Sequence, residues 1–238
     1  MNVTMPYERA PHLFIGFPGR YVDRVWSDSL RALPDRAQRE RRSLVENRFG
    51  TGITEGLLMA SRDGVTFKRW NEAFLRPGIE RPGTWNYSHQ FIGWHPIVTK
   101  SALPGAPDEL SFYAPENLWI SNVRTIRRYT LRLDGFVSAQ APMSGGELIT
   151  KPVRFQGRKL VLNFATSVAG GMRVEIQDLN GRPLPGFSLE DCPTLFGDTI
   201  ERTVVWKKGT DLSAVAGQPV RLRFEFRDAD LYAFQFKP

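Results

Sequence analysis

Apolar and polar residues alternate with a period of two along much of the chain after residue 131. The alternation is clearest over residues 220–227, where every second side chain is apolar and three arginines and one glutamate fill the other positions. In a strand, successive side chains point to opposite faces, so one face of this segment packs and the other meets water. The pattern predicts an antiparallel strand whose buried face is formed by Val220, Leu222, Phe224 and Phe226.

Turn residues divide the same region into short strand-like runs. Gly, Pro, Asp and Asn separate these runs, and tight turns are expected at Asp134-Gly135, Gly170-Gly171 and Asn180-Gly181. About seven or eight strands in roughly 108 residues fit two packed antiparallel sheets. We therefore predict a jelly-roll-like β-sandwich domain over residues 131–238, with strands at 131–133, 146–155, 159–164, 172–176, 202–206, 220–227 and 231–236.

Residues 1–130 are also rich in strand patterns but less evenly spaced. A run over 56–61 leads through Asp63 and Gly64 into a second run over 66–70, which predicts a hairpin in which Asp63 is a turn residue. Such a strand, turn and aromatic strand are typical of a propeller blade. The region is thus predicted to hold partial β-propeller-like blades, with further strands at 12–17, 110–113 and 118–120, and the whole chain is predicted to be all-β.

Composition excludes several classes of protein. The 238 residues are 41% hydrophobic and 12% aromatic, enough to build a core. No stretch approaches the roughly 18 apolar residues of a membrane span, and the N-terminal residues lack the features of a signal peptide, so neither is expected. Cys192 is the single cysteine and there are three histidines, so we expect no internal disulfide, no metal site and no cofactor.

The net charge of +7 raises the question of a polyanionic partner. Arginine accounts for 25 of the 32 basic residues, and these arginines are scattered through the predicted strands, so no nucleic-acid partner is expected. The densest cluster lies at 31–48, where Asp35, Glu40 and Glu46 interrupt six arginines. A solvated helical turn or loop is the favoured interpretation, and an anion or partner site is the alternative.

Four segments of the chain resemble one protein family. They are GLLMASRDGVTFKRWNEAFLRPG at 56–78, RRYTLRLDGFVSAQAP at 127–142, GGELITKPVRFQGRKLVLNFATS at 145–167 and DADLYAFQF at 228–236. Together they look like the C-terminal half of bacterial proteins related to family 32 glycoside hydrolases. The resemblance implies a five-bladed propeller joined to a C-terminal β-sandwich. A complete propeller of that kind takes roughly 250 to 300 residues, so this chain looks like its last two or three blades and the sandwich.

The same resemblance implies a catalytic apparatus whose motifs this chain lacks. The family's nucleophile lies in a Trp-Met-Asn-Asp-Pro-Asn-Gly type segment, which is missing, as is its Glu-Cys acid motif. The family's Arg-Asp-Pro motif is also not matched, because Gly64 follows Arg62 and Asp63. No catalytic residue is therefore carried over from the family.

Two glutamates are candidates by their chemistry alone. Glycoside hydrolysis uses two carboxyl groups, about 5 Å apart for retention or about 6.5 to 9.5 Å apart for inversion. Glu55 directly precedes an apolar run, where it would act as acid or stabiliser or would be a solvent-facing residue at a strand end. Glu116 is flanked by aromatic residues suited to stacking on a sugar ring, with a loop carboxylate beside core aromatics as the alternative.

Five further residues are candidates for binding carbohydrate. Alternation along a strand would place Trp85, Tyr87 and His89 on one face, where they form a stacking platform with Trp94 nearby, or else pack between blades. Arg127 is suited to binding a carboxylate bidentately, or to holding a domain interface together.

Three functions follow from these observations. The first is a glycoside-hydrolase-like, carbohydrate-active protein in which this chain is one half of the propeller and is inactive alone. The second is a carbohydrate-binding module without activity. The third is a self-associating structural protein, because an incomplete propeller leaves strand edges that a second copy can cover.

Overall fold

The computed structural model describes residues 2–120 and 124–238. The chain forms two compact units, Met1–Leu131 and Arg132–Pro238. Both are built mainly from antiparallel strands, and the predicted all-β fold class is confirmed. Within the described residues, no helix is both long and apolar enough to cross a membrane.

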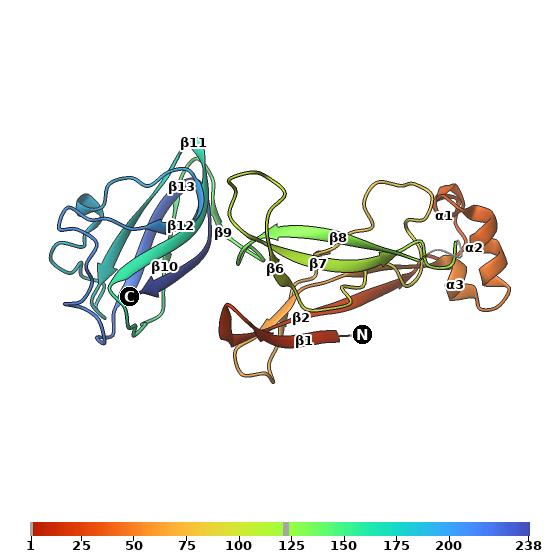
Figure 1. The fold of residues 1–238 in the computed structure, drawn as a ribbon, viewed down its shortest axis with the longest axis horizontal. Helices are drawn as coiled ribbons and strands as arrows, with labels where there is room; N and C mark the ends of the chain where they lie inside the picture. The colour runs from red at the N-terminus through yellow and green to blue at the C-terminus, as the bar shows by residue number, and fades with distance from the viewer. Residues whose placement is uncertain (1, 121–123) are drawn as a thin grey trace. The chain divides into compact units, whose positions relative to one another are not determined.

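In the part of the first unit that the structure describes, there are two sheets and three short helices (Figure 1). The larger sheet is organised around β2, whose N-terminal half pairs with β1 and β4 and whose C-terminal half pairs with β3. Strand β5 extends this sheet beside β4, and β6, β7 and β8 form the second sheet. The strands are β1 (Asn2–Tyr7), β2 (Ala10–Asp23), β3 (Gly52–Gly56), β4 (Met59–Ser61), β5 (Lys68–Arg69), β6 (Ile97–Thr99), β7 (Glu109–Glu116) and β8 (Thr125–Arg132).

Three phenylalanines pack between these sheets and the long loop that joins them. Phe17 of β2 lies with its ring centroid 5.5 Å from that of Phe112 on β7, and Phe74 of the loop lies 5.7 Å and 5.6 Å from the two rings. Two of the three contacts are edge-to-face, the arrangement that aromatic quadrupoles favour. This contact holds the two sheets of the first unit together.

The hairpin predicted around Asp63 is confirmed. Strands β4 and β5 pair antiparallel, and the carboxylate of Asp63 accepts hydrogen bonds from the backbone N–H groups of Val65 and Thr66 at 2.9 and 2.7 Å. These bonds hold the pKa of Asp63 well below its usual range. The predicted strand at 118–120 is wrong, because these residues form a turn and β8 is the strand that pairs with β7.

The arginine-rich segment at 31–48 forms short helices, α1 (Asp28–Ala32), α2 (Arg36–Ser43) and α3 (Asn47–Thr51). The favoured interpretation of a solvated turn fails at Arg39, which is completely buried and donates to the carbonyl oxygens of Pro34 and Thr84. Two of its nitrogen atoms thus have backbone acceptors, whereas Nη1 has no hydrogen-bond partner among the described residues. Burial lowers the pKa of this guanidinium to about 10.

The second unit is one five-stranded antiparallel sheet dominated by two long strands. Strand β11 (Lys159–Gln177) pairs with β13 (Arg221–Lys237) over two stretches, and β9 (Ala139–Ala141), β10 (Gly146–Ile149) and β12 (Asp198–Thr203) complete the sheet. Figure 1 shows β11 and β13 as long curved arrows. A short 3-10 helix, η1 (Leu189–Asp191), lies in the connection between β11 and β12.

The turn predicted at Gly170 and Gly171 is wrong, because the chain does not reverse there. The register of β11 against β13 shifts between Thr166 and Gly171, with Asp228 opposite the extra residues of β11. A Cβ atom on Gly170 would lie 2.3 Å from the carbonyl oxygen of Asp228, so only glycine allows this close approach. The glycines therefore mark a bulge inside one strand and not the end of a hairpin.

The core of the second unit explains why more strands were predicted than occur. Both halves of β11 and both halves of β13 contribute buried side chains to one cluster, so each long strand bends around the core and counts twice in the sequence pattern. The predicted alternation over 220–227 is confirmed, since Val220, Leu222, Phe224 and Phe226 are all buried. The jelly-roll-like assignment of this unit and the propeller-blade assignment of the first unit stay predictions.

We expect Trp206→Phe to lower the free energy of unfolding of the second unit by about 2 kcal/mol. Trp206 is 1% exposed, its indole N–H donates to the carbonyl oxygen of Val174 at 2.9 Å, and its ring meets Phe187 edge-to-face. The substitution removes the hydrogen bond and leaves a buried acceptor and a cavity. Denaturant titration followed by circular dichroism measures the change. The neighbouring exposed residue offers a control, Val205→Ala, and an equal loss in both variants would contradict the assignment.

Candidate functional site

Glu55, the first candidate carboxylate, is one member of a cross-strand ion pair. It is on β3 directly opposite Arg20 of β2, and the two side chains form an ion pair that also carries a hydrogen bond. Arg20 further donates to the carbonyl oxygen of Asn71 at 2.7 Å. Opposite charges facing each other across antiparallel strands stabilise the pairing, so Glu55 joins β3 to β2, and Arg20 also contacts the loop after β5.

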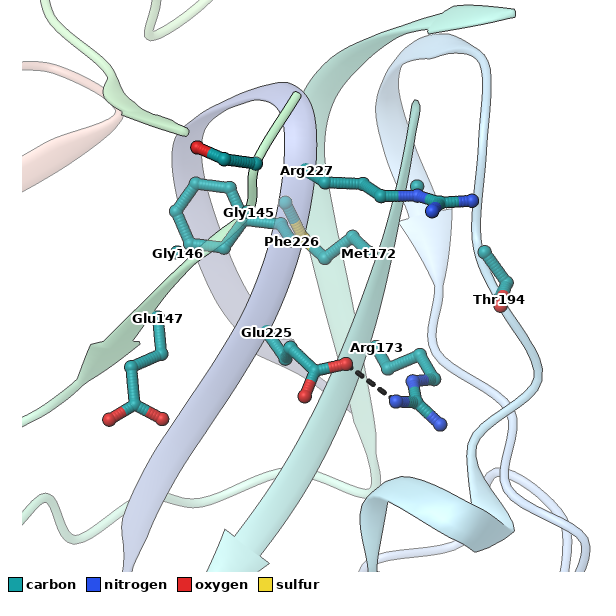
Figure 2. A pocket seen from close by; sticks show the side chains of 11 residues that line it. Gly145, Gly146, Glu147, Met172, Arg173, Thr194, Glu225, Phe226 and Arg227 are labelled. Carbon is teal, nitrogen blue, oxygen red and sulfur yellow. Dashed lines mark hydrogen bonds and ion pairs between the residues drawn. The ribbon is translucent and has the colours of Figure 1, made fainter. Parts of the chain in front are cut away.

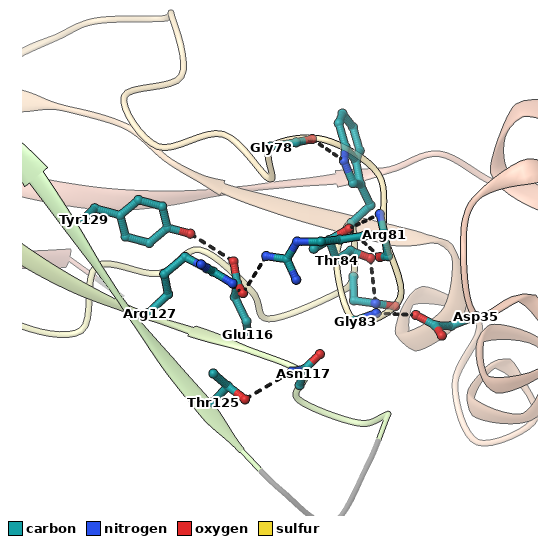
Figure 3. A network of polar contacts seen from close by, with 12 residues as sticks. Asp35, Gly78, Arg81, Gly83, Thr84, Glu116, Asn117, Thr125, Arg127 and Tyr129 are labelled. Carbon is teal, nitrogen blue, oxygen red and sulfur yellow. Dashed lines mark hydrogen bonds and ion pairs between the residues drawn. The ribbon is translucent and has the colours of Figure 1, made fainter.

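Glu116, the second candidate, ends β7 and is almost fully buried. Figure 3 shows three side chains converging on its carboxylate. Arg81 and Arg127 approach to 2.9 and 2.8 Å, and the hydroxyl of Tyr129 donates at 3.1 Å. Burial by itself would raise the pKa of Glu116, but the hydrogen bonds and charges of these partners outweigh it and lower the pKa. A lowered pKa favours the ionised form, which is the opposite of what the proton donor of a glycosidase requires.

The same network accounts for Arg127, which was predicted to bind an external carboxylate. Its guanidinium already pairs with Glu116, and this partner raises the pKa of Arg127 further. Arg81 reaches the same carboxylate from the loop between β5 and β6. Within the first unit, the network therefore fixes that loop against β7 and β8.

The predicted strand face with Trp85, Tyr87 and His89 does not exist. Residues 84–90 form an irregular segment, and the backbone takes positive φ angles at Trp85, Ser88 and Gln90. A period-two arrangement requires extended backbone, so the three side chains diverge. The indole N–H of Trp85 donates to the carbonyl oxygen of Gly78 at 2.8 Å.

His89 and Trp94 have opposite surroundings. His89 is completely buried, and burial lowers its pKa, so the ring is neutral near pH 7. Its Nε2 lies 3.1 Å from the carbonyl oxygen of Leu118, and this contact ties the loop at 117–120 to the interior. Trp94 is 69% exposed and has no role in that contact.

Tyr87 belongs instead to a cluster of four rings contributed by separate parts of the first unit. Its ring centroid lies 5.7 Å from that of Tyr21 on β2 and 5.3 Å from that of Phe49 on α3. Phe49 in turn stacks nearly parallel with Trp119, at 6.1 Å and 13°. We call Tyr21, Phe49, Tyr87 and Trp119 the aromatic cluster. Trp119 is 54% exposed and Tyr21 is 43% exposed, so the cluster presents ring surface to solvent.

Trp119 is held in an unusual backbone conformation. Its φ is 73°, and Asn117 two residues earlier has a φ of 57°. Left-handed conformations cost energy for residues other than glycine and persist where the surroundings fix them. Here the loop is fixed by the His89 contact and by Asn117, which donates to the hydroxyl of Thr125 at 3.1 Å. His89 therefore positions the exposed Trp119 and is not itself open to a ligand.

Two charged residues, Arg48 and Glu46, lie beside the aromatic cluster. The guanidinium of Arg48 lies 5.4 Å from the centroid of the Phe49 ring, in the range of a cation–π contact, and also pairs with Glu46 at 2.8 Å. Both side chains are about half exposed. Hydrogen-bonding groups of both signs thus lie beside the exposed rings.

A groove of about 550 Å³ lies in the second unit and was not predicted from the sequence. Figure 2 shows it between β10, β13 and β11, with the ion pair of Arg173 and Glu225, 2.5 Å long, on its floor. Glycines at 145, 146 and 171 line much of the remaining surface. The signal available in the sequence was this set of glycines, of which Gly171 was interpreted as part of a turn and Gly146 as the start of a strand.

No group of three or more His, Cys, Asp or Glu side chains in residues 2–120 and 124–238 is arranged to hold a metal ion. The buried thiol of Cys192 has a raised pKa because of its burial. A thiol with a raised pKa is a poor nucleophile near neutral pH.

Comparison with known proteins leaves the family open. No protein-family model matches the chain, and no curated protein matches it. A solved structure of a glycoside hydrolase family 43 arabinoxylan arabinofuranohydrolase from Bacillus subtilis, in complex with cellotetraose, aligns with 94% of the chain at 11% identity and a TM-score of 0.27. The chain spans 38% of that protein's length. So distant a likeness assigns no activity, and the resemblance to family 32 is not supported by these comparisons.

We expect Glu116→Gln to destabilise the first unit by about 2 kcal/mol near pH 7. The variant loses two charged partners, but their outer ends are solvated, which limits the loss. Because the folded pKa of Glu116 is lowered, its contribution is complete above the ordinary value of 4.5 and is lost as the pH falls through the folded pKa. The difference in unfolding free energy between wild type and variant should therefore shrink in acid.

Denaturant titrations at pH 7 and at several acidic pH values measure this effect. Glu72→Gln is the matched control, because Glu72 is exposed. A stability difference that stayed constant across the acid range would show that Glu116 is not held as a carboxylate.

Proposed function

We propose that this chain binds carbohydrate through the aromatic cluster and does not hydrolyse it alone. The observation that carries the proposal is the partly exposed ring surface of Trp119 beside Phe49 and Tyr87. The C–H faces of a sugar ring pack on such surfaces, while its hydroxyl groups reach neighbouring polar side chains. Arg48 and Glu46 supply donors and acceptors at the edge of the rings.

The surroundings of the two candidate carboxylates support binding without turnover. Glu55 and Glu116 are each held by arginine, and the lowered pKa of Glu116 is opposite to what a general acid requires. The glycosidase activity predicted from the family resemblance is proposed only for an assembly in which another polypeptide supplies the missing carboxyl groups. The substrate and linkage of such an assembly stay open.

Self-association is the second candidate function, favoured by unpaired strand edges in the first unit. Among the described residues, strand β8 pairs with β7 and with no other strand, and its Ile126 is 70% exposed. An edge of this kind is a template for another strand. Sedimentation analysis separates the two functions by molecular mass. A glycan-binding monomer sediments with the mass of one chain, whereas a self-associating protein sediments as an oligomer whether or not a glycan is present.

We expect Trp119→Ala to weaken the binding of any glycan identified by an array screen by about tenfold or more. The substitution removes the most exposed ring of the cluster. Titration calorimetry of the full chain measures the affinity, and reducing-sugar release from the same glycan measures turnover. Trp94→Ala is the control, because Trp94 is more exposed than Trp119 but lies outside the aromatic cluster.

Two results would overturn the proposal. The first is that no glycan on the array is bound, and the second is that the Trp94 and Trp119 variants lose affinity equally. Release of reducing sugar by the full chain would contradict the absence of turnover. A hydrolytic role for Glu116 would then require that Glu116→Gln abolish that release.

A further inference from the structure

The groove of the second unit is centred on Arg227, whose neighbours on the adjoining strands are glycines. Arg227 of β13 pairs directly with Gly171 of β11. On its other side, a Cβ atom on Gly145 would lie only 4.0 Å from the Cβ of Arg227. Paired residues of neighbouring strands point to the same face of a sheet. The side chain of Arg227 therefore lies on the exposed face beside two glycines, and the methyl group of Thr194 occupies the space over Gly171.

The other charged side chains of the groove already have partners. Glu225 pairs with Arg173 at 2.5 Å, and Glu147 pairs with Arg223 at 2.9 Å. Among the described residues, Arg227 makes no ion pair, and it is exposed. Figure 2 shows its side chain extending toward Thr194. The charge that the groove offers to a ligand is thus one guanidinium.

One unpaired guanidinium, with two ion-paired carboxylates at the next positions of the sheet, selects the charge of the ligand. The planar fork of arginine matches a carboxylate through two parallel hydrogen bonds. A phosphate carries close to two negative charges near pH 7, of which the one unpaired guanidinium neutralises about half. A ligand with a single carboxylate matches the charge of Arg227.

The remaining lining favours a hydroxylated ligand. Thr194 provides a hydroxyl, Glu147 provides carboxylate oxygens that accept from hydroxyl groups, and the glycines leave backbone exposed. The volume of about 550 Å³ lies within the usual range of small-molecule sites. We propose that this groove binds an acidic sugar of the uronic acid class, with Arg227 holding its carboxylate and Thr194 and Glu147 contacting its hydroxyl groups. The choice of a sugar rests on the proposed function, whereas the choice of a carboxylate rests on the groove alone.

The test is a titration of the isotope-labelled full chain, followed by NMR, with galacturonate, galactose, acetate and inorganic phosphate in turn. We expect saturable binding of galacturonate with shifts confined to the residues of the groove. Galactose lacks the carboxylate and acetate lacks the hydroxyl groups, so each should bind at least about tenfold more weakly. Phosphate should bind no better than acetate.

Three variants assign the contacts. Arg227→Gln should weaken galacturonate binding by about tenfold or more, and Arg227→Lys should recover only part of it because an ammonium lacks the fork. Arg154→Gln is the matched control, since Arg154 is exposed and outside the groove.

Each other outcome overturns a stated part of the proposal. Equal affinity for galacturonate and galactose, or no effect of Arg227→Gln, removes the role of Arg227. Equal affinity for galacturonate and acetate would show that the hydroxyl groups of the sugar do not contribute to binding. A preference for phosphate would show that the groove does not select a carboxylate. Absence of saturable galacturonate binding would show that the groove does not bind a uronic acid. If the array screen fails but galacturonate binds, the proposed function at the aromatic cluster fails and the groove remains.

Discussion

The close approach of Gly170 to the backbone of Asp228 is the constraint on which the second unit depends. It allows β11 to carry extra residues against β13, so that both strands bend and bury side chains from each of their halves in one core. The same register places Gly171 opposite Arg227, which leaves that arginine without a side-chain neighbour on β11. One backbone contact thus determines the curvature, the core and the groove.

In the first unit, the corresponding constraint is the buried carboxylate of Glu116. Glu116 gathers arginines from a loop and from β8, and each partner compensates for removing its carboxylate from water. Buried His89 holds the loop that carries Trp119. Glu116 and His89, which the sequence suggested as functional candidates, therefore have structural roles. His89 supports the loop that carries Trp119 of the aromatic cluster.

The sequence predicted local features well wherever a residue's own conformational preference is decisive. The all-β class, the Asp63 hairpin and the inward face at 220–227 follow from turn chemistry and alternation, which act over a few residues. The predictions from the sequence failed where one residue pattern is compatible with two different structures. Glycines at 170 and 171 resemble a turn but form a bulge, and alternation at 85–89 resembles a strand but lies in backbone with positive φ angles.

The sequence by itself determined the all-β class, the Asp63 hairpin, the buried face at 220–227 and the absence of the family's catalytic motifs, because each of these depends on neighbouring residues. Only the tertiary structure decided which side chains meet. Tyr21, Phe49, Tyr87 and Trp119 are far apart along the chain, and Glu116 acquires its partners at distances of 11 to 35 residues. Contacts of this kind depend on strand register and on loop closure, which no local pattern specifies.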